Sequence, residues 1–165
     1  MRKLVLVLCL VISASPAWAL VAPGMRMPAL SLPDTTGATH DLGRLTRGKV
    51  TVLVYWSVSC PICRKEIPSL LALNRRLAGN PFVMLFVNGD GPAMAAAAAG
   101  YARRYNLPGP ILLDQGPGDR MPVSDTFDIV GTPTVLVFDR KGKLVHAQEV
   151  HVDQDKLKRA VEGSF

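Results

Sequence analysis

Two cysteines, Cys60 and Cys63, stand three residues apart where an apolar run meets a helical pattern. At a helix start, cysteines with this spacing lie on one face and can close a small disulfide. Unpaired N–H groups and the helix dipole at that position stabilise a thiolate on the first cysteine. We therefore expect redox chemistry, with Cys60 as nucleophile and the deeper Cys63 resolving the mixed disulfide.

The residues that follow the pair suit this chemistry. Pro61 falls at the first helical position, where its missing N–H costs no helical hydrogen bond. Arg64 and Lys65 add positive potential nearby. Glu66, three residues after Cys63, is expected one helical turn below the disulfide, where its carboxylate can accept or return the Cys63 proton.

Two other uses of a cysteine pair remain as alternatives. A purely structural disulfide is disfavoured, because closing only four residues constrains the unfolded chain little. A metal site would need further ligands, and His40, His146 and His151 are all distant in sequence from the pair. Soft thiolates do suit Cu(I), so a copper-handling or metalloenzyme-assembly protein is the alternative function. We expect no metal and no cofactor.

The first 19 residues have the pattern of a secretory signal. Arg2 and Lys3 precede an unbroken apolar run from Leu4 to Ile12, and Ala17-Trp18-Ala19 supplies small residues at a cleavage site. That run of nine residues is shorter than the roughly 20 of a membrane span. We expect cleavage near Ala19 and residence in the periplasm or another extracytoplasmic space. An uncleaved membrane anchor is the alternative.

Export changes how the composition is interpreted. The chain has 165 residues, 48% of them hydrophobic, and a formal net charge of +6, of which the predicted signal carries two positive charges. Cleavage would also remove Cys9, leaving one cysteine pair in an oxidising compartment. No segment concentrates basic residues with aromatic ones, so nucleic-acid binding is not expected. We expect a monomer.

The rest of the chain predicts one α/β domain over residues 28–165, after a linker over residues 20–27. Asp34–Gly37 predicts a turn between two short strands, and residues 42–45 a single helical turn. The run from Val50 to Trp56 is typical of a strand buried on both faces. Further strands are predicted over 82–87, 111–113, 134–138 and 144–148, and helices over 61–77, 93–105 and 153–162. Pro68 is expected to kink the first of these helices.

A second proline marks the start of a strand, in Gly131-Thr132-Pro133-Thr134. Proline cannot donate to a strand ladder, so it indicates either an ordinary loop or a special backbone. A cis Thr132–Pro133 bond beside the disulfide would expose a backbone edge to an incoming substrate strand. These residues alone favour the ordinary loop.

Residues 49–70 resemble the active-site segment of TlpA/ResA-type thioredoxin-fold proteins. In that family a strand ends in an aromatic–tryptophan pair, and its tryptophan is the first residue of the pattern W-x-x-x-C-x-x-C-R-x-E-x-P. This pattern is matched here from Tyr55-Trp56 to Pro68. Residues 131–134 match the family's cis-proline loop, so the resemblance favours the cis bond. Residues 81–114 match its βαβ insertion, and residues 32–37 its N-terminal hairpin.

The resemblance implies a thioredoxin fold, with a mixed central sheet flanked by helices, and an exported thiol–disulfide oxidoreductase. It implies Cys60 as nucleophile, Cys63 as resolving thiol and Glu66 as active-site acid. It also implies a substrate-binding surface at Trp56 and at Thr132-Pro133. Apocytochrome c or another exported protein is the implied substrate, and a membrane thiol transporter of the CcdA/DsbD type the implied electron donor.

Two departures from the family pattern concern the redox direction. Ser59 precedes the first cysteine, where the family often has tryptophan. Pro61-Ile62 differs from the ResA dipeptide and is similar to the proline-containing pairs of CcmG, MauD and the oxidant DsbA. Ile62 brings no hydrogen bond to the thiolate, which favours a reductant. A disulfide oxidant or isomerase is the alternative.

Overall fold

The apolar run predicted as a buried strand forms β3 (Val50–Trp56), the central strand of a five-stranded mixed sheet. Two strands run parallel to it on one side in succession, β4 (Phe82–Asn88) and then β5 (Ile111–Leu113). On the other side lies β6 (Thr134–Phe138), antiparallel to β3, followed by β7 (Leu144–Glu149). All seven residues of β3 are buried, because both faces of the sheet are covered.

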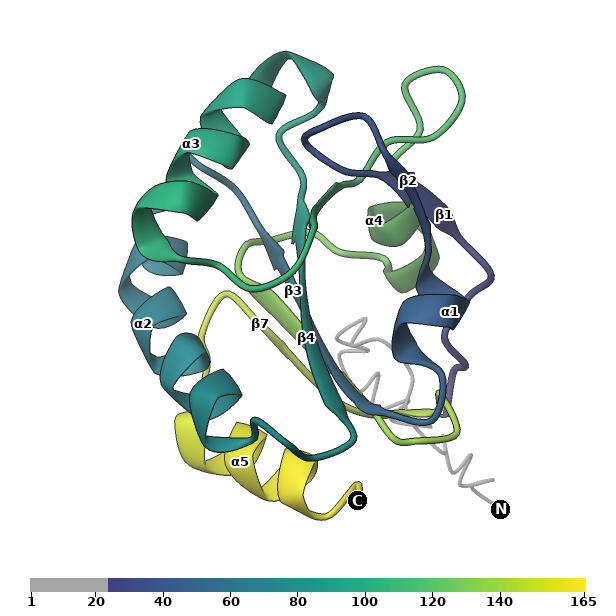
Figure 1. Cartoon of the computed structure of the whole chain (residues 1–165), viewed down its shortest axis with the longest axis vertical. Helices are drawn as coiled ribbons and strands as arrows, with labels where there is room; N and C mark the ends of the chain where they lie inside the picture. The colour runs from purple at the N-terminus through teal and green to yellow at the C-terminus, as the bar shows by residue number, and fades with distance from the viewer. Residues whose placement is uncertain (1–23) are drawn as a thin grey trace, which may run out of the picture.

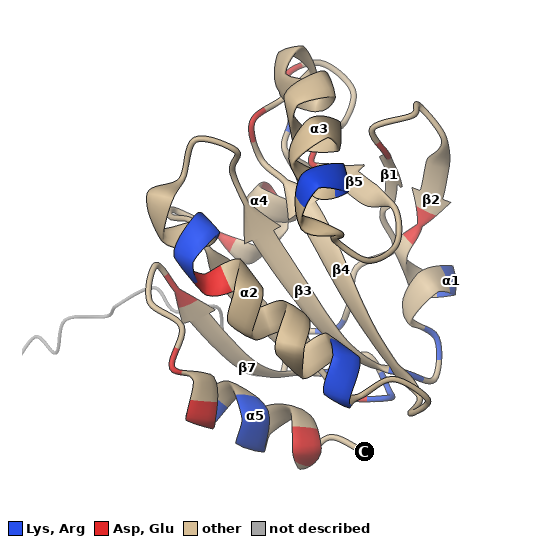
Figure 2. Ribbon diagram, turned by 60° about the vertical axis from the view of Figure 1, so that its left-hand side comes forward, with Lys and Arg blue, Asp and Glu red and all other residues tan. Residues whose placement is uncertain are grey.

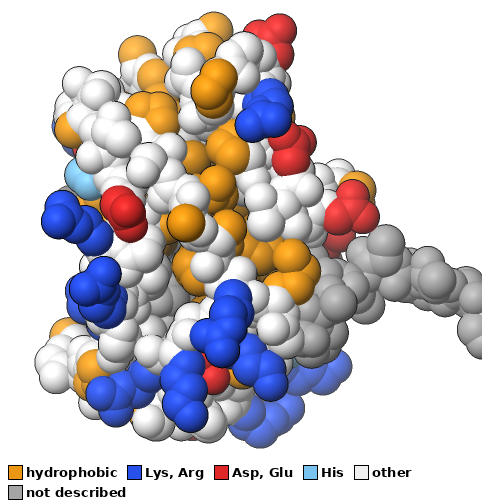
Figure 3. Space-filling model, turned by 90° about the vertical axis from the view of Figure 1, so that its right-hand side faces the viewer, with side chains coloured by type: hydrophobic (Ala, Val, Ile, Leu, Met, Phe, Trp, Pro, Cys, Tyr) orange, Lys and Arg blue, Asp and Glu red, His pale blue; other side chains and the backbone are white. Residues whose placement is uncertain are grey.

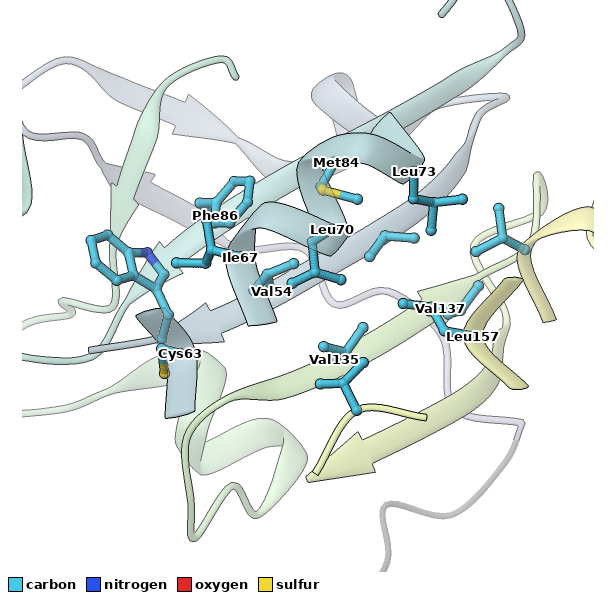
Figure 4. Packing of buried hydrophobic residues seen from close by; sticks show 14 of the residues in the cluster. Val54, Cys63, Ile67, Leu70, Leu73, Met84, Phe86, Val135, Val137 and Leu157 are labelled. Atoms are coloured by element: carbon cyan, nitrogen blue, oxygen red, sulfur yellow. The ribbon is translucent and has the colours of Figure 1, made fainter. Parts of the chain in front are cut away.

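Three helices cover one face of this sheet, as Figures 1 and 2 show: α2 (Pro61–Arg76), α3 (Ala95–Tyr105) and α5 (Gln154–Glu162). Apolar side chains of α2 recur every three or four residues, so they form one stripe that packs on alternate residues of the strands. Figure 4 shows Ile67 and Leu70 in this layer. Burial of each such side chain contributes about 1.5–3 kcal/mol to folding.

The other face is covered by shorter elements: α1 (Leu42–Thr46), α4 (Pro122–Phe127) and the hairpin of β1 (Ser31–Pro33) and β2 (Thr39–Asp41). Their apolar residues pack on the alternate set of strand side chains, which includes Leu53. The molecule is therefore built of three layers, with the sheet in the middle (Figure 1).

The predicted thioredoxin fold is confirmed, and most element boundaries agree within two residues. The predicted βαβ insertion is β4–α3–β5, with the 3₁₀ turn η1 (Pro92–Met94) leading into the helix. The helix α2 continues through Pro68 and ends at Arg76. Helix α4 was not predicted, because its six residues are too few to show a periodicity.

The computed structural model describes residues 24–165, so the predicted signal and its cleavage site lie outside the described residues. The predicted linker extends to residue 27, but its described end packs on the domain. Gly24 and Met27 donate backbone hydrogen bonds to Leu144 and Gly142, and Met25 accepts one from Leu144. Among the described residues, no helix has the length and apolar character needed to cross a membrane.

Candidate active site

The two cysteines form a disulfide at the start of α2. Cys60 is the N-cap residue, and its Sγ accepts a 3.0 Å hydrogen bond from the backbone N–H of Cys63. Pro61 occupies the first helical turn, as predicted. Cys60 is 9% exposed and Cys63 is fully buried, so the predicted difference in accessibility is confirmed. Figure 4 shows Cys63 at the end of the buried stripe of α2.

The loop before β6 lies against this disulfide because of the strand register. Thr134, the first residue of β6, is paired with Tyr55 near the end of β3. The residues before Thr134 therefore meet the residues after β3, and the carbonyl oxygen of Thr132 lies 3.4 Å from the Sγ of Cys60. The Thr132–Pro133 bond is cis, as the resemblance implied.

A carboxylate that sequence reasoning missed holds the proline loop from the other side. The Oε1 atom of Glu149, the last residue of β7, accepts hydrogen bonds from the N–H groups of Val130 (2.7 Å) and Gly131 (2.6 Å). The Thr134 hydroxyl donates to the Gly131 carbonyl over 2.7 Å. Strands β6 and β7 pair Thr134 with Glu149, which places the Glu149 carboxylate beside the loop. No local sequence pattern marks such a contact.

A second carboxylate that sequence reasoning missed holds the segment between β3 and Cys60. The carboxylate of Asp90, after β4, accepts hydrogen bonds from the Ser57 hydroxyl at 2.5 Å and the Val58 N–H at 2.7 Å. The buried Asn88 donates its side-chain amide to the same carboxylate over 2.7 Å. Strand β4 runs parallel to β3, so the two chain segments leave the sheet at the same edge. Asp90 thereby holds in place the segment that leads into Cys60.

Glu66 lies on α2 and is half-buried. Its Oε2 accepts a 2.9 Å hydrogen bond from the side-chain amide of Gln154, the first residue of α5. This bond joins the active-site helix to the C-terminal helix and restricts the orientation of the carboxylate. The described contacts of Glu66 do not include either cysteine sulfur. Its role as proton carrier stays a prediction.

Trp56 differs from the expectation that it belongs to the substrate-binding surface. The residue is the last of β3, on the face beneath α2 and α3, and its side chain is fully buried. Its ring packs on Tyr101 of α3 with a centroid distance of 5.0 Å. With no exposed surface, Trp56 cannot contact a docked polypeptide directly in this structure. It belongs instead to the buried cluster that also contains Cys60 and Cys63.

The preceding residue of β3, Tyr55, points to the opposite face of the sheet. Burial and the carboxylate of Asp114 beside it raise the pKa of the Tyr55 hydroxyl. Burial likewise raises the pKa of Asp114, although N–H groups of Val123 and Ser124 at the start of α4 donate to its carboxylate at 2.8 and 2.9 Å. Asp114 thus anchors the unpredicted helix α4 to the sheet.

Apolar side chains flank the disulfide on the surface. Ile62 between the cysteines is 40% exposed, Val130 in the proline loop is 86% exposed and Val150 after β7 is 45% exposed. Val150 belongs to this site because its N–H donates to the carbonyl of Pro133 over 2.7 Å. These three residues form an apolar rim around a nearly buried sulfur pair.

The three histidines lie apart from the pair. His40 bonds to Asp34 at 2.8 Å, His146 bonds to Gln148 at 2.8 Å, and His151 is exposed. Over residues 24–165, no three His, Cys, Asp or Glu side chains are grouped closely enough to hold a metal ion together.

Comparisons with known proteins show the family to which the chain belongs. The sequence model of the Redoxin family matches residues 22–162. The chain is 25% identical to the thioredoxin-like protein YneN of Bacillus subtilis, over 80% of this chain and 72% of that protein. It is 28% identical to the thiol-disulfide oxidoreductase ResA of Halalkalibacterium halodurans, over 69% of this chain and 61% of that protein.

A solved structure has the same fold. The thiol:disulfide interchange protein of the thioredoxin family from Chlorobium tepidum superimposes with a TM-score of 0.71 at 19% identity. The match covers 87% of this chain and 97% of that one.

Proposed function

Since the chain belongs to the Redoxin family and is a TlpA/ResA-like thiol:disulfide oxidoreductase, we propose that it reduces disulfides of other exported proteins, with Cys60 as nucleophile. The observation that carries this proposal is the position of Cys60. Its sulfur caps the helix α2, receives an N–H hydrogen bond and faces the backbone of the cis-proline loop. The helix start favours the thiolate once the disulfide is reduced.

The reaction begins with the reduced pair. The Cys60 thiolate attacks one sulfur of a substrate disulfide, which forms a mixed disulfide and releases the other substrate sulfur as a thiolate. Cys63 then loses its proton and attacks the Cys60 sulfur. The Cys60–Cys63 disulfide forms, and the second substrate sulfur leaves as a thiolate that takes up a proton. The substrate gains two electrons, and the enzyme loses two.

Glu66 is the proposed acceptor of the Cys63 proton, directly or through one water molecule. It is half-buried on the same helix as Cys63, and the Gln154 amide holds its carboxylate in one orientation. A carboxylate at this position accelerates the second step because thiolate, and not thiol, attacks the mixed disulfide.

The substrate is proposed to dock as an extended segment across Thr132 and Pro133. The apolar rim of Ile62, Val130 and Val150 suits a cysteine flanked by apolar residues in an unfolded or loosely folded protein. Apocytochrome c is the substrate that we propose. A membrane thiol transporter of the CcdA/DsbD type would return the pair to the dithiol state, because the oxidised enzyme cannot act again without an electron donor.

Trapping tests the proposal. The Cys63→Ser variant, expressed in its host, should accumulate mixed disulfides through Cys60, and mass spectrometry after a non-reducing separation would name the partners. The Cys60→Ser/Cys63→Ser double variant is the matched control and should trap nothing. Absence of adducts, combined with tight Cu(I) binding that Cys60→Ser abolishes, would contradict the proposal. A midpoint potential near the −120 mV of DsbA would overturn the reducing direction.

A further inference from the structure

A group of cationic side chains lies at the end of the sheet opposite to the disulfide. They come from the described N-terminal segment, the loop before β3 and the turn between β6 and β7. We call this group the cationic pole: Arg26, Arg47, Lys49, Arg140, Lys141 and Lys143. Five of the six are exposed, and Lys49 is half-buried. Figure 3 shows Lys and Arg side chains gathered at the lower end of this face of the molecule.

The fold brings these residues together. Arg26, Arg47, Arg140 and Lys141 line one surface hollow of about 290 Å³. The Arg140 Nε donates to the Gly48 carbonyl over 3.2 Å, and Arg26 forms a backbone bridge with Lys143. The cluster is therefore a feature of the tertiary structure that joins three distant segments.

The cationic pole holds the excess positive charge of the described chain. With Arg2 and Lys3 outside the described residues, 17 Lys and Arg face 13 Asp and Glu, a net charge of +4. The six cations and the single carboxylate of Asp139 within the group amount to +5, so the remaining described side chains sum to −1. The molecule thus has one strongly positive end.

The five exposed cations of the pole are available to an external partner, whereas the half-buried Lys49 donates from its Nζ to the Leu45 carbonyl over 3.2 Å. Within residues 24–165, the ion pairs involve His40, Arg76 and Lys156, and none involves a residue of the cationic pole. Asp139 uses its carboxylate to accept hydrogen bonds from the backbone N–H groups of Lys141 and Lys143, both 2.9 Å long. It orders the turn that displays these two side chains.

The cationic pole lies at the end of the molecule where the described chain begins. The described chain starts here, because the N–H of Gly24 bonds to the Leu144 carbonyl beside Lys143. The preceding sequence contains the apolar run Leu4–Ile12. Strand β3 starts at this end and leads to Cys60 at the other, and its seven residues span about 20 Å.

We propose that the cationic pole docks reversibly on an anionic membrane surface. While it is docked, the Cys60–Cys63 disulfide faces away from the lipid and toward exported substrates, and release of the pole lets the disulfide meet an electron donor in the membrane. A phospholipid surface fits better than an acidic protein, because the five exposed cations suit a broad surface of repeated negative charge. The described chain also begins at this end, and the sequence before Gly24 contains an apolar run. Docking by the pole would act whether or not the apolar run is retained. The docking is independent of the direction of electron transfer, and only the role of release rests on the proposed function.

The test is vesicle flotation of the full chain in its cellular form. Vesicles of phosphatidylcholine alone are compared with vesicles that also contain phosphatidylglycerol. The apolar run contributes to both, so the measured quantity is the ratio of the two partition coefficients. Each Lys or Arg near an anionic surface strengthens binding by about five-fold. The Arg47→Gln/Arg140→Gln/Lys141→Gln variant should therefore lower this ratio by at least about ten-fold, and salt near 1 M should remove the effect.

A matched variant controls for net charge. Arg64→Gln/Lys65→Gln/Arg120→Gln removes three exposed cations from the disulfide end of the molecule, where Arg120 lines a hollow with Asp90. It should keep the wild-type ratio. Equal losses in the two triple variants, or no dependence of the wild type on phosphatidylglycerol, would overturn the proposal. So would protection of the disulfide from a soluble phosphine when vesicles bind, because the docked pole should leave that rate unchanged.

Discussion

The carboxylate of Glu149 accepts a 2.6 Å hydrogen bond from the backbone N–H of Gly131, two residues before the cis proline. The same oxygen accepts a second bond from Val130, so one side chain of β7 holds the loop that faces Cys60. Asp90 does the same for the segment that leads into Cys60. The disulfide therefore lies between two loops, one held by a carboxylate at the end of β7 and the other by a carboxylate in the loop after β4.

Replacement of Glu149 should disturb the substrate-facing loop. Glu149→Ala removes the acceptor of two backbone N–H groups, and we expect a loss of about 1–3 kcal/mol in the free energy of unfolding. We expect kcat/KM for a protein disulfide to fall about ten-fold or more, because the docking edge loses its position. Glu149→Gln keeps one oxygen acceptor, so its kcat/KM should lie between those of the wild type and Glu149→Ala. Glu162→Ala, an exposed glutamate on α5, should leave kcat/KM unchanged.

Replacement of Asp90 should loosen the segment that leads into Cys60. Asp90→Ala leaves the Val58 N–H without its acceptor and removes the shorter of the two hydrogen bonds that the buried Asn88 amide donates. It should lower the free energy of unfolding by about 1–3 kcal/mol. The segment before Cys60 should become more mobile, and hydrogen exchange of residues 57–60 should be faster. Asp119→Ala serves as control, because it removes an exposed acid that lines one surface hollow together with Asp90. Unchanged exchange in Asp90→Ala would refute the positioning role.

Glu66→Gln should slow the resolution step without unfolding the domain. The amide cannot take the Cys63 proton, so the rate of thiol exchange should fall and its pH profile should change shape. Gln154→Ala removes the hydrogen bond that orients the carboxylate, and we expect a smaller effect of the same kind. Glu162→Gln is the matched control. If the pH–rate profile of Glu66→Gln equals that of the wild type, Glu66 is only a structural charge.

Gly131 is required by the close approach of Val150. A Cβ atom at position 131 would lie 2.7 Å from the Val150 Cγ2, so Gly131→Ala should cost about 1–3 kcal/mol of stability. Val150→Ala removes the obstructing methyl group. Val150 also has a φ of 64°, an unfavourable conformation for a β-branched residue. Chemical denaturation of the Gly131→Ala/Val150→Ala double variant should show a smaller loss than Gly131→Ala alone, and a purely additive result would contradict this explanation.

Asp34 should make the free energy of unfolding depend on pH in the acidic range. Burial opposes its ionisation, but hydrogen bonds from Thr36, His40 and Ala38 outweigh burial and lower its pKa to about 2. A carboxyl group with a lowered folded-state pKa stabilises the fold above its unfolded-state pKa of about 3.8, and this contribution is lost as the pH falls toward 2. The loss between pH 5 and pH 2 should be about 1–2 kcal/mol. Asp34→Asn should lack this part of the dependence in urea titrations, and an unchanged slope would contradict it.

The local parts of the site were predictable because their signals are contiguous. The run from Val50 to Trp56 has the composition of a strand buried on both faces, and the spacing of Cys60 and Cys63 suits a helix start. The residues around Pro133 left two readings open, and the family resemblance selected the cis bond that the structure contains.

The supporting residues were not predictable because their partners are remote in sequence. Asp90 and Glu149 bond to backbone N–H groups 32 and 18 residues away, and such bonds require no particular residue type at the partner. Helix α4 is short and is anchored by Asp114, nine residues before Val123. The burial of Trp56 follows from the packing of α2 and α3 on β3, and the cationic pole from the meeting of three loops at one sheet end. Sequence alone determined the reacting sulfurs and the elements that carry them. Strand pairing decided which side chains hold those sulfurs in place, because hydrogen bonds and burial depend on distance in space.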